Sequence, residues 1–289
     1  MKLKGFIYAV ISSIFFGSAG IFVKSNLNEN FSSVDLLMLQ YIIALVILFL
    51  ICIIKYRQNL KLSGPMLKKL IIQGALFNTF MTIFFYSSFE YLDMAMATML
   101  LYLYPAIVAA ISFIFFKAKI SRIKIAAICG CLLGSLLVLN IQSGSFSSIS
   151  LRGIIYGVLA ALFYSFMNLY AEGIVEDVPS MVITFYTTFF SLIVLFIINF
   201  GFIGKIPEIS LASIQNAALL AFFCEIIPLT LLYSAIKHIG SVTTSIISTI
   251  ELPASAVFSY FIMHESISFV QIVGILIIGY SVIVLKKEH

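Results

Sequence analysis

The 289-residue chain has little charge and no tryptophan. Only 10% of its residues are charged, whereas soluble domains carry about 25%, and 62% of its residues are hydrophobic. A soluble protein of this length would need a charged surface to cover its core, so the composition excludes that class. The sequence therefore predicts an integral membrane protein whose apolar side chains face lipid.

Residues that usually carry catalysis or metal binding are also scarce. The four cysteines fall in apolar segments, and the three histidines lie at predicted helix ends or at the terminus. No metal-ligand spacing, Ser-His-Asp set or Gly-Lys-Ser/Thr phosphate loop is present. We therefore expect no metal, no cofactor and no nucleotide hydrolysis, and an enzyme is disfavoured.

What the chain does have is an internal repeat. Residues 5–15 (GFIYAVISSIF) recur at 153–163 (GIIYGVLAALF), with five of eleven positions identical. Tyr86-Ser87 matches Tyr233-Ser234, and Pro105 matches Pro253. A repeat of that length indicates one structural half copied, which is typical of transporters built around a shared central site.

The sequence predicts ten membrane-spanning helices and no strands. A helix that crosses the hydrocarbon layer needs about 20 mostly apolar residues, and the apolar runs lack the alternation of barrel strands. The predicted spans are 5–24, 34–54, 68–90, 94–116, 121–140, 152–171, 180–200, 212–236, 241–263 and 269–285. Five spans per repeat is an odd number, so the two repeats must run in opposite senses across the membrane.

The positive residues predict the orientation of these spans. If the N-terminus is cytoplasmic, fourteen of the seventeen Lys and Arg fall on the inner side, and only Lys24, Arg152 and Lys205 fall outside. The positive-inside rule then places both termini in the cytoplasm. The net charge of +5 is explained by topology, so we expect no nucleic-acid partner.

The chain is predicted to divide at a Ser/Gly-rich stretch. We expect a first five-helix repeat over 1–141, an external linker over 142–150 and a second five-helix repeat over 151–289. The first span is interpreted as a retained helix rather than a signal peptide, because it is long, lacks a cleavage pattern and has a partner in mid-chain.

Within this frame, several motifs carry a family resemblance. The first repeat ends with Y-S-S-F-E-Y-L, small residues, L-Y-P-A, a basic hairpin and a Gly-containing helix. The second contains Y-S-A-I-K-H-I-G, T-S-I-I-S-T-I-E-L-P-A-S-A and M-H-E-S. In this order, and over essentially the whole chain, they resemble the EamA branch of the drug/metabolite transporter superfamily.

The resemblance implies a secondary transporter, usually an exporter of small metabolites, amino acids or drugs. Helices one, three, four, six, eight and nine would surround a central cavity. The chain departs from the family where it lacks the tryptophan that relatives often carry near the end of the first helix. It also has Leu103 and Lys117 where the second repeat has Glu251 and Glu265.

Two carboxyl groups are the strongest functional candidates. Glu225 and Glu251 lie near the middle of the eighth and ninth predicted spans, where no Lys or Arg lies at comparable depth. A charge there costs about 2.5–3.5 kcal/mol on insertion scales, and desolvation favours the neutral carboxyl. We expect them to bind an amino-bearing or cationic substrate, or to exchange protons. The alternative is a neutral Glu hydrogen-bonded to a neighbouring helix.

Other polar residues and prolines complete the candidate set. Asn78, which aligns with Glu225, and the aromatic residues Tyr104 and Tyr186 are expected to line the substrate path. Three prolines within spans remove backbone donors and are expected to act as hinges or cavity lining: Pro105, Pro228 and Pro253. For Pro228, curvature for helix packing is an equal alternative.

The expected partners are a small-molecule substrate and the lipid bilayer of a prokaryotic cell membrane. A monomer and a homodimer both stay open, although Gly130 and Gly134 favour packing within one chain over dimerisation. Proton antiport, exchange and facilitated diffusion are equally open. The main alternative function is a flippase for a lipid-linked or lipid-like substrate, and a non-transporting subunit or sensor is less favoured.

Overall fold

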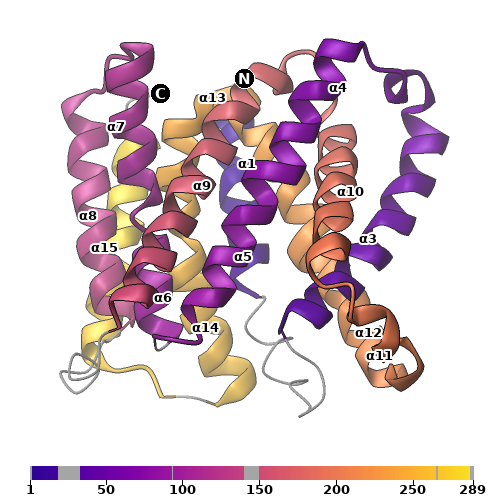
Figure 1. Cartoon of the computed structure of the whole chain (residues 1–289). Coiled ribbons are helices and arrows are strands. Elements are labelled where there is room, and N and C mark those ends of the chain that lie inside the picture. Colours follow the sequence, from indigo (N-terminus) through magenta and orange to yellow (C-terminus); the bar gives the residue numbers. More distant parts are fainter. Residues whose placement is uncertain (1, 19–32, 93, 140–149, 265, 287–289) are drawn as a thin grey trace.

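The computed structural model describes residues 2–18, 33–92, 94–139, 150–264 and 266–286, and its regular secondary structure in these ranges is entirely helical (Figure 1). The elements of the first half are α1 (Lys2–Gly17), α3 (Ser33–Lys55), η1 (Arg57–Leu60), α4 (Gly64–Ile71), the π-helical η2 (Ile72–Asn78), α5 (Thr79–Ser88), α6 (Met94–Leu101), α7 (Tyr104–Phe116) and α8 (Arg122–Leu139). The elements of the second half are α9 (Leu151–Val175), α10 (Ser180–Ile198), α11 (Phe202–Lys205), η4 (Ile206–Glu208), α12 (Leu211–Leu220), the π-helical η5 (Ala221–Ile226), α13 (Ile227–Ser248), α14 (Glu251–Met263) and α15 (Phe269–Lys286).

Eight helical stretches within the described ranges are long and apolar enough to cross a membrane. The prediction of an all-helical membrane protein is therefore confirmed. The first predicted span continues past residue 18 into residues outside the described ranges. Glu265 and residues 142–149 of the predicted linker 142–150 also lie outside them.

The boundary predicted between the eighth and ninth spans falls where the chain bends. The stretch Leu211–Ser248 covers the eighth span and the start of the ninth, and it consists of two helices joined at a kink. Its bend is at Gly240, whose φ of 76° and ψ of 164° are accessible to glycine but not to other residues without strain. One glycine therefore turns the chain at the predicted boundary, and the predicted ninth span is further interrupted at residues 249–250.

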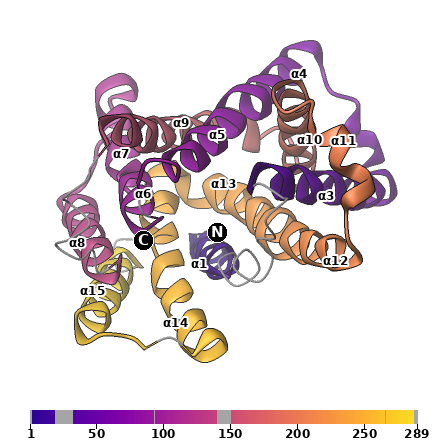
Figure 2. The ribbon, with the colours of Figure 1, turned by 60° about the horizontal axis from the view of Figure 1, so that its bottom comes forward.

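The two halves pack as counterparts in opposite senses. The helix α1 packs on α13 and α14, and its counterpart α9 packs on α5 and α6; α3 pairs with α10, and α8 with α15 (Figure 2). The start of α1 and the end of α9 lie at the same end of the bundle, because Gly5 adjoins His238 and the Lys237 ammonium donates to the Glu176 carbonyl. The arrangement agrees with an inverted repeat.

Glycines allow α8 and α15 to pack closely. A Cβ atom on Gly134 would lie 2.6 Å from Ile278 and 2.9 Å from the Gly274 carbonyl oxygen. The Gly130/Gly134 pair thus lets α8 approach α15 of the same chain, as the sequence favoured. Large apolar side chains on the outer surface, such as Phe116 and Tyr280, are exposed, as expected of residues whose solvent is lipid.

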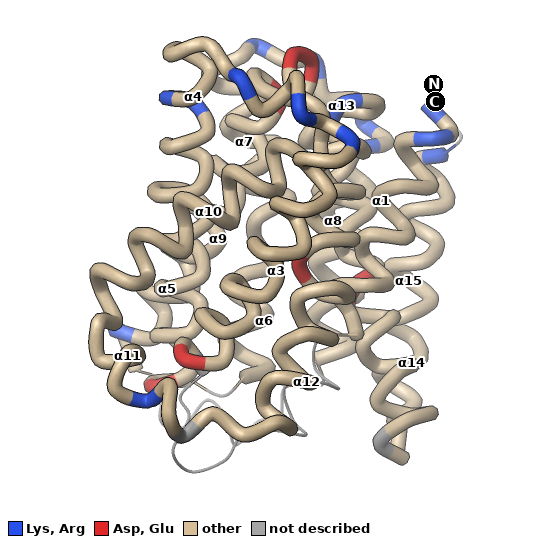
Figure 3. The backbone as a smooth tube through the Cα atoms, turned by 90° about the vertical axis from the view of Figure 1, so that its right-hand side faces the viewer, with Lys and Arg blue, Asp and Glu red and all other residues tan. Residues whose placement is uncertain are grey.

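The charged residues gather at the two ends of the bundle (Figure 3). Most basic positions lie at the end that carries both termini. At the opposite end, the fully buried Asp35 carboxylate pairs with the Lys205 ammonium at 2.6 Å and accepts from the Asn199 amide at 2.9 Å. This ion pair joins α3 to the segment that follows α10.

Candidate functional site

Each repeat contains a π-helical segment at the same place in its third predicted span. In the first half it ends at Asn78, and in the second half it contains Glu225. A π-helical turn leaves backbone groups without their usual partners and occurs often at functional sites. In η2, the Gly74 carbonyl accepts from the Thr79 backbone N–H, from the Thr79 hydroxyl at 2.8 Å and from the Ser191 hydroxyl at 2.9 Å.

The two corresponding polar side chains share one neighbourhood. The Asn78 amide donates to the Ser191 hydroxyl at 2.9 Å and to the Tyr41 hydroxyl at 3.2 Å. Glu225, 7% exposed, accepts a hydrogen bond of 2.8 Å from the Thr188 hydroxyl. Tyr41 lies within electrostatic range of Glu225, so Asn78 and Glu225 belong to one buried polar cluster.

A polar stripe on α10 holds this cluster together. Its members recur at the three- and four-residue spacing that places side chains on one helix face. All four are buried: Thr184, Thr187, Thr188 and Ser191. The stripe faces α13, where Thr184 bonds Thr230 and Thr187 bonds Tyr233. This stripe was not predicted, although its spacing is visible in the sequence.

Glu251 lies where the predicted ninth span is interrupted. The helix α13 ends at Ser248, and α14 begins at Glu251. The first repeat has the matching break, since α6 ends at Leu101 and α7 begins at Tyr104. Glu251 and Tyr104 each lie thirteen residues before a left-handed residue that ends their helix, His264 and Lys117. Paired interruptions in the two halves are the strongest structural pointer to a transporter's binding site.

Tyrosines surround Glu251. The buried Tyr102 lies near its carboxyl group. Tyr104, only 2% exposed, donates its hydroxyl to the Ser245 carbonyl at 3.1 Å, and its ring packs on Tyr164 with centroids 4.3 Å apart. At the first residue of α14, a negative charge also benefits from the positive end of the helix dipole.

The structure brings the two carboxyl groups into one central region. The end of α1 lies against both segments, because a Cβ atom on Gly17 would lie 2.7 Å from the Glu251 backbone carbonyl oxygen and the Ser18 Oγ lies 3.9 Å from the Cys224 Sγ. Figure 3 shows acidic positions at mid-height of the bundle, away from its two ends. In the part of the chain that the structure describes, neither Glu225 nor Glu251 forms an ion pair with Lys, Arg or His. Their charge is therefore uncompensated unless a proton or a cation binds.

Two further acceptor atoms in the core have no hydrogen-bond partner among the described residues: Gln73 Oε1 and Asn168 Oδ1. The amide nitrogens are fixed, because Gln73 donates to the Met167 carbonyl at 3.0 Å and Asn168 donates to the Tyr164 carbonyl at 2.9 Å. A buried acceptor without a donor costs free energy, so these oxygens suit a ligand that donates hydrogen bonds. Gln73 was not predicted as a site residue.

The three prolines each begin a helix after an irregular segment. Pro105 lies in the first turn of α7, Pro253 in the first turn of α14, and Pro228 in the first turn of α13 directly after η5. At a helix start proline removes no helical hydrogen bond. Pro228 differs from the other two, because the π-helical η5 runs into α13 without a break before it. The Pro228 carbonyl accepts from the Ser12 hydroxyl at 2.7 Å. A hinge role for these residues stays a prediction.

Tyr186 lies apart from the other candidates. Its hydroxyl donates to the Leu60 carbonyl at 2.9 Å, and its ring stacks on Phe190. Leu60 belongs to η1, the connection near the basic end of the bundle. The structure therefore does not bring Tyr186 together with Glu225 or Glu251, and its role in a substrate path stays a prediction.

The Thr188 hydroxyl gives a first test of this geometry. Thr188→Val removes the donor to Glu225 and keeps the shape of the side chain. A membrane hydrogen bond contributes about 0.6 kcal/mol on average, and one to a charged group about 1.5–3 kcal/mol, so substrate affinity is expected to fall by a factor between about 3 and 100. Thr184→Val, one turn away and without a carboxylate partner, should change affinity little in the same binding assay. Equal effects of the two variants would contradict this assignment.

Comparison with protein families finds that both halves of the chain match the same family. Residues 3–140 and 151–286 each match the model of the EamA-like transporter family. Two curated relatives are described as uncharacterized transporters. The protein YxxF of Bacillus subtilis (strain 168) is 29% identical over 211 residues, which is 72% of this chain. The matched part is 66% of the length of YxxF, slightly less than two thirds. A Clostridium kluyveri protein is 24% identical over 283 residues, covering 95% of this chain and 90% of its own length.

A solved crystal structure has the same fold. It superposes with a TM-score of 0.82 and covers 99% of this chain and 98% of the other, at 14% sequence identity. At that identity the likeness concerns the arrangement of the helices and not the substrate.

Proposed function

The chain belongs to the EamA-like transporter family, and from this we propose that it is a secondary active transporter that exports small amino-bearing metabolites or organic cations. The observation that carries the substrate class is the pair Glu225 and Glu251 in a core where, among the described residues, no cation pairs with them. A carboxylate in apolar surroundings is strongly disfavoured without a partner. A substrate ammonium or a proton supplies that partner.

The proposed topology is ten spans in two inverted five-helix repeats, over 1–141 and 151–289, with both termini in the cytoplasm of a prokaryotic cell. The concentration of Lys and Arg at the end with both termini (Figure 3) supports this orientation. The shared packing partners of α1 and α9 support the inversion. The assembly is proposed to be a monomer or a homodimer.

The proposed mechanism is alternating access in which protons and substrate compete for the same carboxyl groups. Release of a proton leaves a negative charge that binds the cationic substrate, and reprotonation on the other side expels it. The α6/α7 interruption in the first half and the α13/α14 interruption in the second half both lie near Glu251. Their corresponding places in the two repeats support movement at Pro105 and Pro253. Pro228, next to η5, is proposed as a third flexible point.

Around this centre, we propose specific roles for the polar residues. Glu251 and Glu225 each exchange a proton for the substrate ammonium, and Tyr104 forms part of the aromatic wall beside Glu251. Asn78 orients the cluster through Ser191 and Tyr41. Tyr186 is proposed to line the path at the basic end.

Counterflow into proteoliposomes tests the proposal. A panel of labelled organic cations, amino acids and neutral metabolites should give uptake of the amine-bearing members only, and uptake should change with pH when the carboxyl groups exchange protons. Uptake of neutral or anionic members alone would contradict the substrate class. Failure of every water-soluble member would favour the second candidate, a flippase for a lipid-like substrate.

A further inference from the structure

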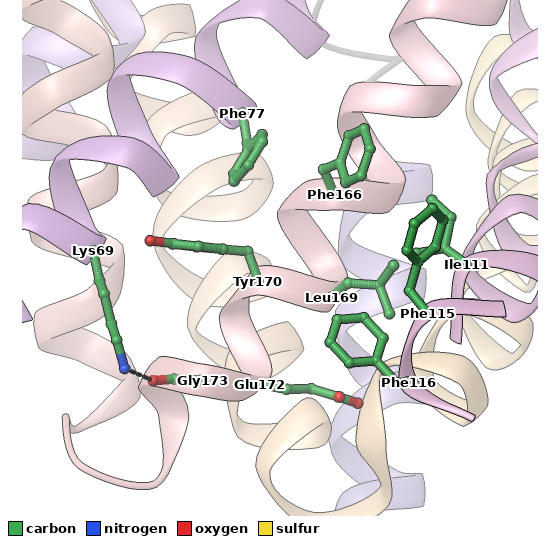
Figure 4. Close-up of a pocket in the computed structure, with 10 residues that line it drawn as sticks. All are labelled: Lys69, Phe77, Ile111, Phe115, Phe116, Phe166, Leu169, Tyr170, Glu172 and Gly173. Atoms are coloured by element: carbon green, nitrogen blue, oxygen red, sulfur yellow. Dashed lines mark hydrogen bonds between the residues drawn. The ribbon is translucent and has the colours of Figure 1, made fainter. Parts of the chain in front are cut away.

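A groove separate from the candidate site opens beside α9, between η2 and α7 (Figure 4). It has a volume of about 670 Å³, within the range of about 300–1,000 Å³ that ligand pockets show. Its walls are mostly apolar and include Phe77, Ile111, Phe115, Phe116, Phe166 and Leu169. Phe115 and Phe116 are 74% and 67% exposed, so the groove is open to the surrounding lipid.

Opposite charges stand at one end of the groove. Lys69 of α4 and Glu172 of α9 both line it (Figure 4). The Lys69 ammonium donates to the Gly173 carbonyl at 2.8 Å, which leaves two of its three donors for another partner. The Glu172 Oε1 atom accepts from the Ser241 backbone N–H, and Lys69 and Glu172 form no ion pair with each other.

The charged end decides which ligand the groove selects. Its apolar walls cannot distinguish one lipid from another, because lipid tails are as apolar as leucine side chains. A headgroup with a phosphate and an ammonium matches Lys69 and Glu172 together. A headgroup with only a negative charge leaves Glu172 unmatched, and a quaternary ammonium has no N–H to donate to the carboxylate.

We propose that this groove is a binding site for phosphatidylethanolamine. One acyl chain lies against Phe77 and Phe166, the phosphate binds the Lys69 ammonium, and the primary ammonium donates to the Glu172 carboxylate. The site depends on the chain lying in a membrane and is independent of the substrate proposed above. The lipid thereby bridges α4 and α9, one helix from each repeat.

Native mass spectrometry of the purified full-length protein tests this site with three probes that share acyl chains: phosphatidylethanolamine, phosphatidylglycerol and phosphatidylcholine. We expect the ethanolamine lipid to be retained about tenfold more strongly than either competitor, the factor that one charge-assisted hydrogen bond supplies. Lys69→Gln should weaken retention of all three lipids. Glu172→Gln should remove only the preference for the ethanolamine lipid.

Two further variants distinguish specific binding at this site from nonspecific lipid binding. Lys68→Gln removes the adjacent lysine that does not line the groove, and it should leave retention unchanged. Gly173→Phe places a ring in the groove. A Cβ atom at this position would meet only the Lys69 ammonium, at 3.9 Å, so the protein should still fold. The variant should abolish the selective lipid binding. Equal loss in Lys68→Gln and Lys69→Gln, wild-type binding in Gly173→Phe, or no preference among the three lipids would overturn the proposal.

Discussion

Glu251→Gln is expected to abolish concentrative transport of the amine-bearing substrate while leaving the protein folded. The substitution keeps the shape of the side chain and the Tyr102 contact but removes the negative charge. Truncating one partner of a buried charge pair costs about 2–5 kcal/mol or more, which corresponds to a loss of affinity of roughly thirtyfold or greater. Uptake into proteoliposomes and elution as a single species on size-exclusion chromatography are the two measurements.

The matched control is Glu90→Gln. Glu90 is an exposed carboxylate in the turn after α5, so the same isosteric change removes a charge outside the proposed site. It should transport like the wild type. If Glu251→Gln and Glu90→Gln transport alike, Glu251 has only a packing role and the family fold is unaffected.

Gly74→Leu is expected to have the largest effect on stability. A Cβ atom at this position would lie 2.5 Å from the Thr187 carbonyl oxygen and 3.0 Å from Phe190 Cβ. These are backbone and near-backbone atoms of α10, so they cannot move aside without displacing the helix. Inserting side-chain atoms into a packed core typically costs about 1–3 kcal/mol, and more where the neighbours cannot adjust.

A displacement of α10 by the new side chain would also break the hydrogen bonds around Asn78. Ser191 donates to the Gly74 carbonyl and accepts from Asn78, so a shift of α10 breaks both contacts. We expect a melting temperature several degrees lower and transport reduced in proportion to the remaining folded protein. Gly279→Leu, at a glycine of α15 where an added Cβ atom would meet nothing within 4 Å, should melt near the wild type. A stable Gly74→Leu protein would mean that α10 does not pack tightly on η2.

Much of the candidate site was predictable from the sequence. Charge inside an apolar span is costly, so Glu225 and Glu251 were identifiable without knowledge of the fold, and Asn78 followed from its alignment with Glu225. The interruptions beside Pro105 and Pro253 were predicted as kinks, and the structure shows each proline in the first turn of a new helix. The repeat predicted that these features belong to corresponding places in the two halves.

Other features could not be predicted, for physical reasons. A π-helical turn inserts one residue into a helix without changing its hydropathy, so η2 and η5 leave no signal in the apolar pattern. The position of the turn at Gly240 was predicted, but its tightness depends on one backbone conformation that the apolar pattern does not reveal. Tyr186 lies in a long aromatic and apolar run, where nothing in the sequence indicates that its hydroxyl reaches Leu60 rather than the central carboxyl groups.

Proton release on substrate binding tests the central claim most directly. The purified protein, in weakly buffered solution with a pH-sensitive dye, is mixed with the amine-bearing substrate identified by counterflow. Competition between proton and cation for the core carboxyl groups predicts that wild-type protein releases protons as it binds. The Glu225→Gln/Glu251→Gln double variant should release none. Saturable binding to the wild type without proton release would contradict the account, because the substrate would then occupy a site that these carboxyl groups do not control.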